Sequence, residues 1–293
     1  MYRGFDKKEL ETQYSPSSCI EDIMVYINQY VDSSKAVLAK AQSDNTVIEN
    51  ISYGDSKEQT LDLYLPKEQG NKTGKLQVYI HGGYWQELSK NESSFAAANF
   101  QQHNCHFAVI NYTLAPNATL SEIVEENRKA LIHLYLNAAK YGYDAEEIYL
   151  SGSSAGGHLT LMMLLTDWTQ YGVNENQAKR LVKGVGAVSG VYDLEPIQYT
   201  YVNDPLKLTF TETIQNSPIL HQVKNRCPVI LAYGENETAE FKRQSLEMSV
   251  FLKHQGIEVE LKEIPERNHF DVIMDLSNAD SWLFQQTAKQ MGL

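Results

Sequence analysis

The sequence predicts an α/β fold, with a mostly parallel central sheet and helices on both of its faces. From residue 76 onward, short apolar runs of strand length alternate with longer segments of helical periodicity. This alternation is typical of parallel sheets whose crossover connections are helices. A Gly-x-Ser-x-Gly motif at residues 152–156 lies between one such run and a helical pattern. The chain shows no internal repeat, low-complexity tract or linker, so we expect one domain over residues 1–293.

The composition limits the class of protein. Apolar residues make up 42% of the chain, as in an ordinary globular core. The formal net charge of −12 and the lack of a basic block argue against nucleic acid or anionic membranes as partners. No apolar run reaches the roughly 18 residues of a membrane span. Cys19, Cys105 and Cys227 are few and far apart, which predicts neither a disulfide framework nor a metal cluster.

The N-terminal region, residues 1–45, is expected to be a polar arm followed by a helix. Residues 1–15 are mixed in charge and lack an apolar segment, so we expect no secretory signal and a cytoplasmic location. Apolar side chains recur at helical spacing over residues 19–41, with Ser17 or Ser18 as the helix cap. We expect this helix to pack on the body of the domain, and a partial cover over the active site is the second interpretation.

The remaining elements follow in order. Two extended runs separated by a polar turn predict an antiparallel hairpin over residues 46–53 and 60–65. The further expected strands are residues 76–80, 105–110, 148–151, 181–189, 228–233 and 257–264. The expected helices are residues 91–103, 121–141, 158–166, 238–255 and 276–290.

Residues 190–226 interrupt this alternation with prolines, aspartates and tyrosines. We interpret the segment as a cap-like insertion that, with the N-terminal helix, forms a small cap over the site and lines part of the pocket. The alternative is an irregular surface excursion.

The Gly-x-Ser-x-Gly motif predicts a nucleophile. Ser154 is expected at the apex of a sharp strand-to-helix turn, which exposes its hydroxyl. Gly152 and Gly156 flank the turn, where a Cβ would clash. A helix begins directly after Ser154, so the Ala155 amide and the positive end of the helix dipole point toward the reaction centre.

A pair of glycines predicts the oxyanion site that such a nucleophile needs. Gly82 and Gly83 follow the apolar run at residues 76–80 and allow the backbone to bend and present amide donors. We expect the amides of the loop from Gly82 to Tyr84, with that of Ala155, to hold the oxyanion. An ordinary glycine turn is the alternative, which the motif about seventy residues later disfavours.

The catalytic base is expected to be His269, because the order in folds with this motif is Ser, acid, His, with the His after the last strand. The other histidines have simpler explanations. His254 lies near the end of a helix, and His158 is one helical turn beyond Ser154. His81 is expected to fix its own glycine loop by hydrogen bonding.

The acid is expected directly after the strand at residues 228–233. Its task is to accept the imidazole N–H and stabilise the imidazolium. Glu237, just before the following helix, is our first choice, and Glu235 is the second. Glu240 is interpreted as a first-turn helix residue that interacts with the helix N-terminus.

These motifs together resemble the kynurenine formamidases (arylformamidases) of the α/β-hydrolase superfamily, and more broadly the hormone-sensitive-lipase-like esterases. The similarity lies in His-Gly-Gly-Tyr-Trp at 81–85, Gly-Ser-Ser-Ala-Gly-Gly-His-Leu at 152–159, Ser-Gly-Val-Tyr-Asp-Leu at 189–194, and Asn-His-Phe at 268–270. It implies Ser154 as nucleophile, His269 as base and position 237 as acid. The family usually has Asp at 237 and often has His at 153, where this chain has Glu and Ser.

The resemblance implies a serine hydrolase that cleaves a small aryl formamide or N-acyl amide, such as N-formyl-kynurenine, without a metal or organic cofactor. Tyr84, Trp85, Tyr192 and Phe270 are candidates for contact with an aryl group. One alternative is a carboxylesterase for short-chain acyl esters. A non-catalytic binding protein with this fold is disfavoured because Ser154 and His269 are both present. A homodimer is the assembly to be tested.

Overall fold

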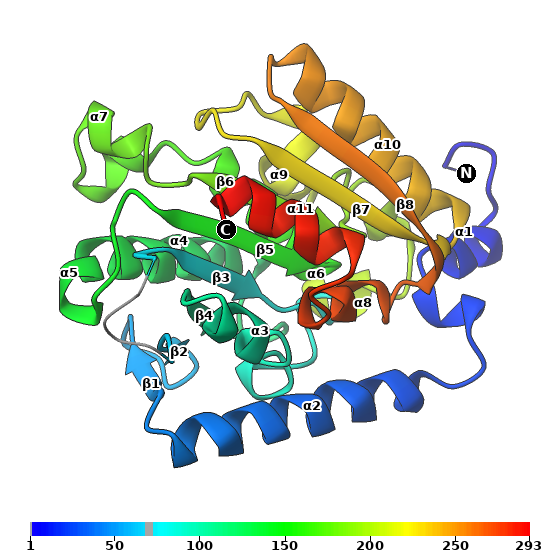
Figure 1. Ribbon diagram of the computed structural model, residues 1–293. Coiled ribbons are helices and arrows are strands. Elements are labelled where there is room, and N and C mark those ends of the chain that lie inside the picture. Colours follow the sequence, from blue (N-terminus) through cyan, green and yellow to red (C-terminus); the bar gives the residue numbers. More distant parts are fainter. Residues whose placement is uncertain (1, 68–72) are drawn as a thin grey trace.

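The computed structural model describes residues 2–67 and 73–293. Its described strands form one eight-stranded sheet with the order β1-β2-β4-β3-β5-β6-β7-β8 (Figure 1). Strands β3 to β8 are parallel, whereas β1 and β2 form an antiparallel hairpin at one edge, with β2 antiparallel to β4. The strands are Val47–Ser52 (β1), Thr60–Tyr64 (β2), Leu76–Ile80 (β3), His106–Ile110 (β4), Ile148–Ser153 (β5), Gly184–Val188 (β6), Val229–Asn236 (β7) and Val259–Asn268 (β8). The predicted mostly parallel sheet and its hairpin are confirmed.

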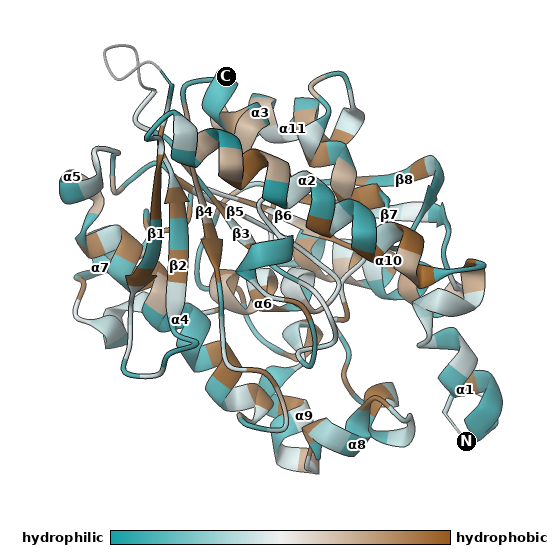
Figure 2. Cartoon of the chain, turned by 90° about the horizontal axis from the view of Figure 1, so that it is seen from below, coloured by the Kyte–Doolittle hydropathy of each residue, from teal (hydrophilic) through white to brown (hydrophobic). Residues whose placement is uncertain are grey.

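Helices cover both faces of this sheet, as predicted. Helices α4, α6 and α10 share one hydrophobic cluster with the sheet, and α2, α3 and α11 share the other. Because side chains alternate across a strand, neighbouring residues such as Val78 and Tyr79 enter opposite clusters. Figure 2 shows hydrophobic residues on strands such as β2 and β4, and a mixture of hydrophobic and hydrophilic residues on the helices. The helices are Lys7–Gln13 (α1), Ile23–Ser43 (α2), Ala97–Gln102 (α3), Leu120–Leu136 (α4), Ala138–Tyr141 (α5), Ala155–Leu164 (α6), Glu175–Ala178 (α7), Asn203–Leu206 (α8), Phe210–Asn216 (α9), Ala239–His254 (α10) and Trp282–Met291 (α11).

The N-terminal region differs from its prediction in two ways. The expected polar arm contains α1, whose N-terminus is stabilised by a capping box between Asp6 and Glu9. The long helix begins four residues later than expected, because Asp22 caps it by accepting from the Met24 amide at 2.8 Å. Ser17 belongs instead to a separate 3-10 turn, Pro16–Cys19. Figure 1 shows α1 beside the end of β8, with α2 running below the sheet toward β1.

Other element boundaries also differ, including that of the helix predicted over 276–290, which begins at Trp282. The helix predicted over residues 91–103 is shortened to α3, because residues up to Glu92 form their own 3-10 turn capped by Ser89. The helix predicted over 121–141 is divided at Asn137 into α4 and α5. Strand β8 extends past residue 264 because its pairing with β7 resumes beyond an irregularity, with Asn236 opposite Asn268. His269 therefore follows the strand directly.

The insertion at residues 190–226 contains α8, α9 and two 3-10 turns, Pro196–Tyr199 and Pro218–Leu220. It is tied to the domain by Asn216, whose side-chain amide donates to the Ser121 hydroxyl of α4 at 2.9 Å, and by buried apolar residues such as Ile197. Among the helices in the described part of the chain, none combines the length and apolarity needed to cross a bilayer.

The turn between β5 and α6 requires unusually close backbone contact. A Cβ on Gly156 would lie 2.0 Å from the Ile80 carbonyl oxygen and 2.7 Å from that of His81. Glycine at 156 therefore lets α6 press directly against the end of β3, which fixes the position of Ser154 relative to the glycine loop.

We predict that Gly156→Ala lowers the free energy of unfolding by about 3 kcal/mol, since the new methyl group meets rigid backbone. Gly186→Ala in β6 is the matched control, because its Cβ would find no atom closer than 3.8 Å. Urea unfolding measures both. Equal, small effects of the two substitutions would contradict the close packing at Gly156.

Candidate active site

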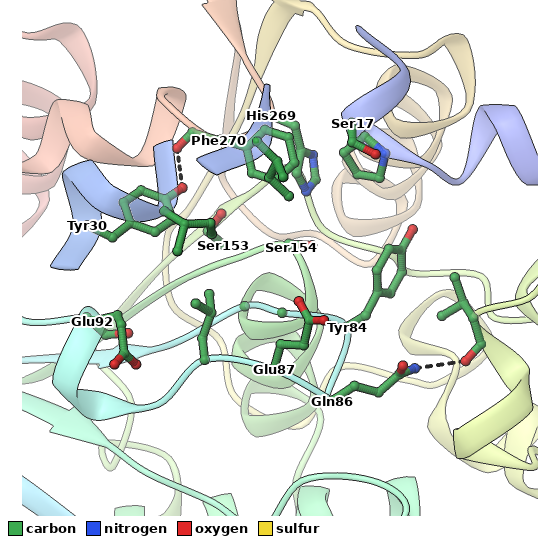
Figure 3. A pocket seen from close by; sticks show the side chains of 18 of the residues that line it. Ser17, Tyr30, Tyr84, Gln86, Glu87, Glu92, Ser153, Ser154, His269 and Phe270 are labelled. Carbon is green, nitrogen blue, oxygen red and sulfur yellow. Dashed lines mark hydrogen bonds between the residues drawn. The ribbon is translucent and has the colours of Figure 1, made fainter. Parts of the chain in front are cut away.

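The site lies in a cavity at the carboxyl ends of the parallel strands, where open α/β sheets bind ligands. The space inside it, with the open solvent at its mouth included, is about 1020 Å³. Figure 3 shows Ser154, His269 and Tyr84 on its wall. The other lining residues are Pro16, Ser17, Ile23, Ile27, Tyr30, Tyr79, Gly82, Gly83, Gln86, Glu87, Leu88, Glu92, Ser93, Phe95, Ser153, Tyr201, Val202 and Phe270.

Ser154 occupies the junction between β5 and α6. Its φ of 58° and ψ of −120° lie outside the ordinary regions for a residue with a side chain, and such strain is characteristic of functional turns. The Ser154 amide donates to the Val188 carbonyl at 2.8 Å, which holds the turn against β6. The hydroxyl thus lies at the cavity wall, beside the amino end of α6, as the motif predicts.

A buried hydrogen bond joins two of the predicted site residues. His269 Nδ1 lies 2.8 Å from Glu237 Oε2, and the carboxylate is fully shielded from solvent. The other ring nitrogen of His269 is therefore free of this bond, and His269 shares the cavity wall with Ser154. Among the described residues no hydrogen bond joins Ser154 to His269, a contact that is often long before substrate binds.

The second oxygen of Glu237 is also held. Glu237 Oε1 accepts from the Ser189 hydroxyl and from the Gly234 amide, each at 2.6 Å. Glu235 lies in a different environment: it is exposed, and its carboxylate accepts from the Glu266 amide at 2.8 Å. Of the two carboxylates considered from the sequence, the structure brings only Glu237 to His269.

The glycine loop lies against Ser154. A Cβ on Gly82 would be 3.3 Å from Ser154 Cβ, and Gly83 has a φ of 93° that favours glycine. Tyr84 follows with a positive φ of 50°. None of the hydrogen bonds within the described residues uses the amides of Gly83, Tyr84 or Ala155. These three N–H groups thus have no hydrogen-bond partner in the described part of the chain.

Two other histidines are buried and are not suited to proton transfer. Burial lowers the pKa of His81 and the pKa of His158 to about 4, so both are neutral near pH 7. His81 Nδ1 lies 2.9 Å from the Gly82 oxygen, which agrees with its predicted role in the loop. His158 Nε2 lies 2.7 Å from the Asn216 oxygen and links α6 to the insertion. His254 is exposed at the end of α10.

Only part of the predicted aromatic contact set reaches the cavity. Tyr84 and Phe270 line it. Trp85 and Tyr192 do not, and both are fully buried. The Trp85 ring points into the core, where it meets His158 edge-on at 5.0 Å. The expectation that Trp85 and Tyr192 contact an aryl group is therefore not supported and needs correction.

Sequence reasoning missed several residues of the site. The sequence indicated Ser189 only as part of the segment at 189–194 that resembles the kynurenine formamidases. Its contact with Glu237 depends on β6 lying beside β7. Tyr30 and Ile27 of α2 enter the cavity wall from a helix more than a hundred positions before Ser154. The only sequence signal for them was the amphipathic pattern, which does not say what the apolar face contacts.

The charge of the cavity wall is one-sided. Glu87 and Glu92 line it, and none of its lining residues is a lysine or an arginine. Figure 3 shows the Glu87 carboxylate directed toward the space in front of Ser154. The wall therefore favours neutral or cationic groups over anions. In the described residues, no three His, Cys, Asp or Glu side chains are grouped as metal ligands.

Comparison with known proteins gives a consistent result. The BD-FAE family model matches residues 61–252. A kynurenine formamidase of Danio rerio is 35% identical over 99% of this chain and 98% of its own length, and one of Salmo salar is 34% identical over the same shares. A crystal structure from Silicibacter sp. tm1040, of a protein proposed to be a thioesterase, has 27% identity and a TM-score of 0.81, covering 94% of this chain and 98% of its own.

The solved structure of esterase B from Lactobacillus rhamnosis shares the fold, with 18% identity, a TM-score of 0.68 and coverage of 92% of this chain and 93% of that one. Fold and site thus define an α/β-hydrolase, and the protein is a hydrolase. Within that class, the chain belongs to the kynurenine formamidase family, as the sequence motifs predicted.

Proposed function

We propose that the protein hydrolyses a small aryl formamide, of the N-formyl-kynurenine type, through a serine acyl-enzyme. The observation that carries this proposal is the cavity that Ser154 and His269 both line, with Glu237 hydrogen-bonded to Nδ1 of His269. Its apolar and aromatic lining, including Phe95 and Phe270, suits an aryl group. The family supports a formamide as the scissile group, because two relatives that match 99% of this chain are named kynurenine formamidases.

In the proposed mechanism, His269 removes the Ser154 proton as the hydroxyl oxygen attacks the formyl carbon. Glu237 accepts the Nδ1–H and stabilises the imidazolium that forms. The amides of Ala155 and of the loop from Gly82 to Tyr84 hold the oxyanion. His269 then protonates the aryl amine as it leaves, and water repeats the sequence to release formate.

We predict that Ser154→Ala abolishes hydrolysis of p-nitrophenyl acetate and of aryl formamides, because the acyl-enzyme cannot form. Labelling by a fluorophosphonate probe should be lost in the same variant. Ser153→Ala is the control, since Ser153 lines the same cavity one residue away and its loss should leave labelling intact. Labelling that survives in Ser154→Ala would refute the nucleophile.

We predict that Glu237→Gln lowers kcat by about 10⁴-fold, because an amide donor facing Nδ1 disfavours the required tautomer. Glu235→Gln removes a carboxylate of the same type from an exposed position and should keep kcat within about twofold. Steady-state rates on p-nitrophenyl acetate compare the two. A near-normal rate in Glu237→Gln with a collapse in Glu235→Gln would exchange their roles.

A carboxylesterase for short acyl esters is the second candidate function. It is favoured by the match to esterase LipC of Mycobacterium tuberculosis, at 25% identity over 63% of this chain. Both functions would use Ser154, His269 and Glu237 in the same way, so only substrate preference separates the formamidase from the carboxylesterase. A non-catalytic binding protein is disfavoured, because the hydrogen-bonded pair of His269 and Glu237 would then have no reaction to serve.

The charge of the cavity wall predicts a ranking of substrates. N-formyl-kynurenine carries no net charge near pH 7, whereas N-acyl anthranilates are anions. Glu87 and Glu92 should therefore lower kcat/KM for N-formyl anthranilate about tenfold relative to N-formyl-kynurenine. Short p-nitrophenyl esters, which are neutral, complete the comparison. A preference for the anthranilate would contradict the inferred selectivity, and a preference for the esters would favour the carboxylesterase.

The proposal includes a small-molecule substrate, with no nucleic acid or membrane partner, and a cytoplasmic location. Cys19, Cys105 and Cys227 are all free thiols, which fits a reducing compartment. A homodimer remains a prediction.

A further inference from the structure

The loop that carries His269 is held from α2. The Tyr26 hydroxyl accepts from Asn268 Nδ2 at 2.8 Å, and the Tyr30 hydroxyl donates to the Phe270 carbonyl. The rings of Tyr26 and Phe270 stack with centroids 5.7 Å apart. The residues on both sides of His269 are thus bonded to a single helix (Figure 3 draws the bond from Tyr30).

The loop that carries Glu237 is held by the segment at the end of α1. Thr238, the next residue after Glu237, donates its hydroxyl to the Gln13 carbonyl at 2.6 Å. The Gln13 side chain accepts from the Glu240 amide at 3.2 Å. Glu240 lies in the first turn of α10, as expected, and its carboxylate accepts from the Tyr14 hydroxyl at 2.8 Å and pairs with Arg243.

The glycine loop is bonded to the same segment. The Tyr84 hydroxyl donates to the Tyr14 carbonyl at 2.6 Å. Tyr14 is itself fully buried and anchored to α10 by its hydroxyl. The loop that presents the free amides of Gly83 and Tyr84 is therefore tied to the residue that follows Gln13.

The three loops leave different strands, β3, β7 and β8, and β3 is separated from β7 by two strands in the sheet. Residues 13–30 contact all three loops at the carboxyl ends of the strands. Pro16, Ser17 and Ile23 in this segment also line the cavity. Pairing between β7 and β8 ends at Asn236 and Asn268, one residue before Glu237 and His269, so contacts outside the sheet position the residues beyond that point.

We propose that residues 13–30 act as a positioning clamp, which holds the base loop, the acid loop and the glycine loop in register around Ser154. The inference rests on the proposed function, because it assigns Tyr26 and Tyr30 as positioning residues for His269. From the sequence, this region was predicted only to contain a helix that packs on the domain or partly covers the site. In the clamp, its polar groups align the catalytic loops while its apolar residues form the cavity wall.

The test removes single hydroxyl groups. Tyr26→Phe and Tyr30→Phe keep the rings and lose only the bonds to the base loop. Tyr143→Phe is the matched control: Tyr143 is buried and donates to the Leu134 carbonyl at 2.6 Å, near the start of β5, at the opposite end of the strand from Ser154. Thr238→Val, which loses the bond to Gln13, tests the acid loop separately.

The measurements are kcat and KM for p-nitrophenyl acetate, the rate constant for fluorophosphonate labelling, and Tm. We expect Tyr26→Phe and Tyr30→Phe to lower kcat and the labelling rate about tenfold, with KM changed less than about twofold, because small misplacement of a base costs mainly the chemical step. Thr238→Val should behave similarly. Tyr143→Phe should lower Tm as much as Tyr26→Phe and Tyr30→Phe do, but it should leave kcat unchanged.

Unchanged kcat and labelling in the three site variants would overturn the clamp, as would an equal loss of kcat in Tyr143→Phe, which would indicate a general effect of stability. These outcomes are distinct from failure of the proposed substrate. A wild-type protein that hydrolyses p-nitrophenyl acetate but no aryl formamide would refute the formamidase activity and still test the clamp. A wild-type protein that neither turns over nor becomes labelled would refute both.

Discussion

The site depends on the carboxylate of Glu237, which lies at the centre of three hydrogen bonds from different parts of the chain. It accepts from His269, from Ser189 at the end of β6 and from the Gly234 amide of its own strand. A buried carboxylate is costly unless its oxygens are satisfied, and here both are. Its orientation is therefore fixed, and so is the imidazole that it holds.

A second constraint is the close contact among the backbones around Ser154. Gly156 lets α6 meet the end of β3, and Gly82 lets the glycine loop approach the serine. The packed sheet thus sets the separation between the proposed nucleophile and the free amides. The loops that complete the site extend beyond the sheet, where the N-terminal segment contacts each of them. The contacts that hold the site therefore come from two regions of the chain, the sheet and the N-terminal segment.

Much of this arrangement could be predicted from the sequence. The alternation of strands and helices indicated the parallel sheet, and Ser154, Glu237 and His269 each follow a strand, so they meet at one edge. The contacts that depend on strand order could not be predicted, such as that of Ser189 with Glu237. Trp85 and Tyr192 were candidates for contact with an aryl group, but both are buried in the core. The apolar face of α2 gave no sign of what it covers.

The most direct test of the account is to locate the covalent adduct. The protein is inactivated with a fluorophosphonate, digested, and the modified peptide is sequenced by tandem mass spectrometry. Two adjacent serines, Ser153 and Ser154, line the cavity, so the fragment ions must separate them. The account predicts a single phosphonyl group on Ser154. An adduct on Ser153, or on a residue outside the cavity, would contradict it.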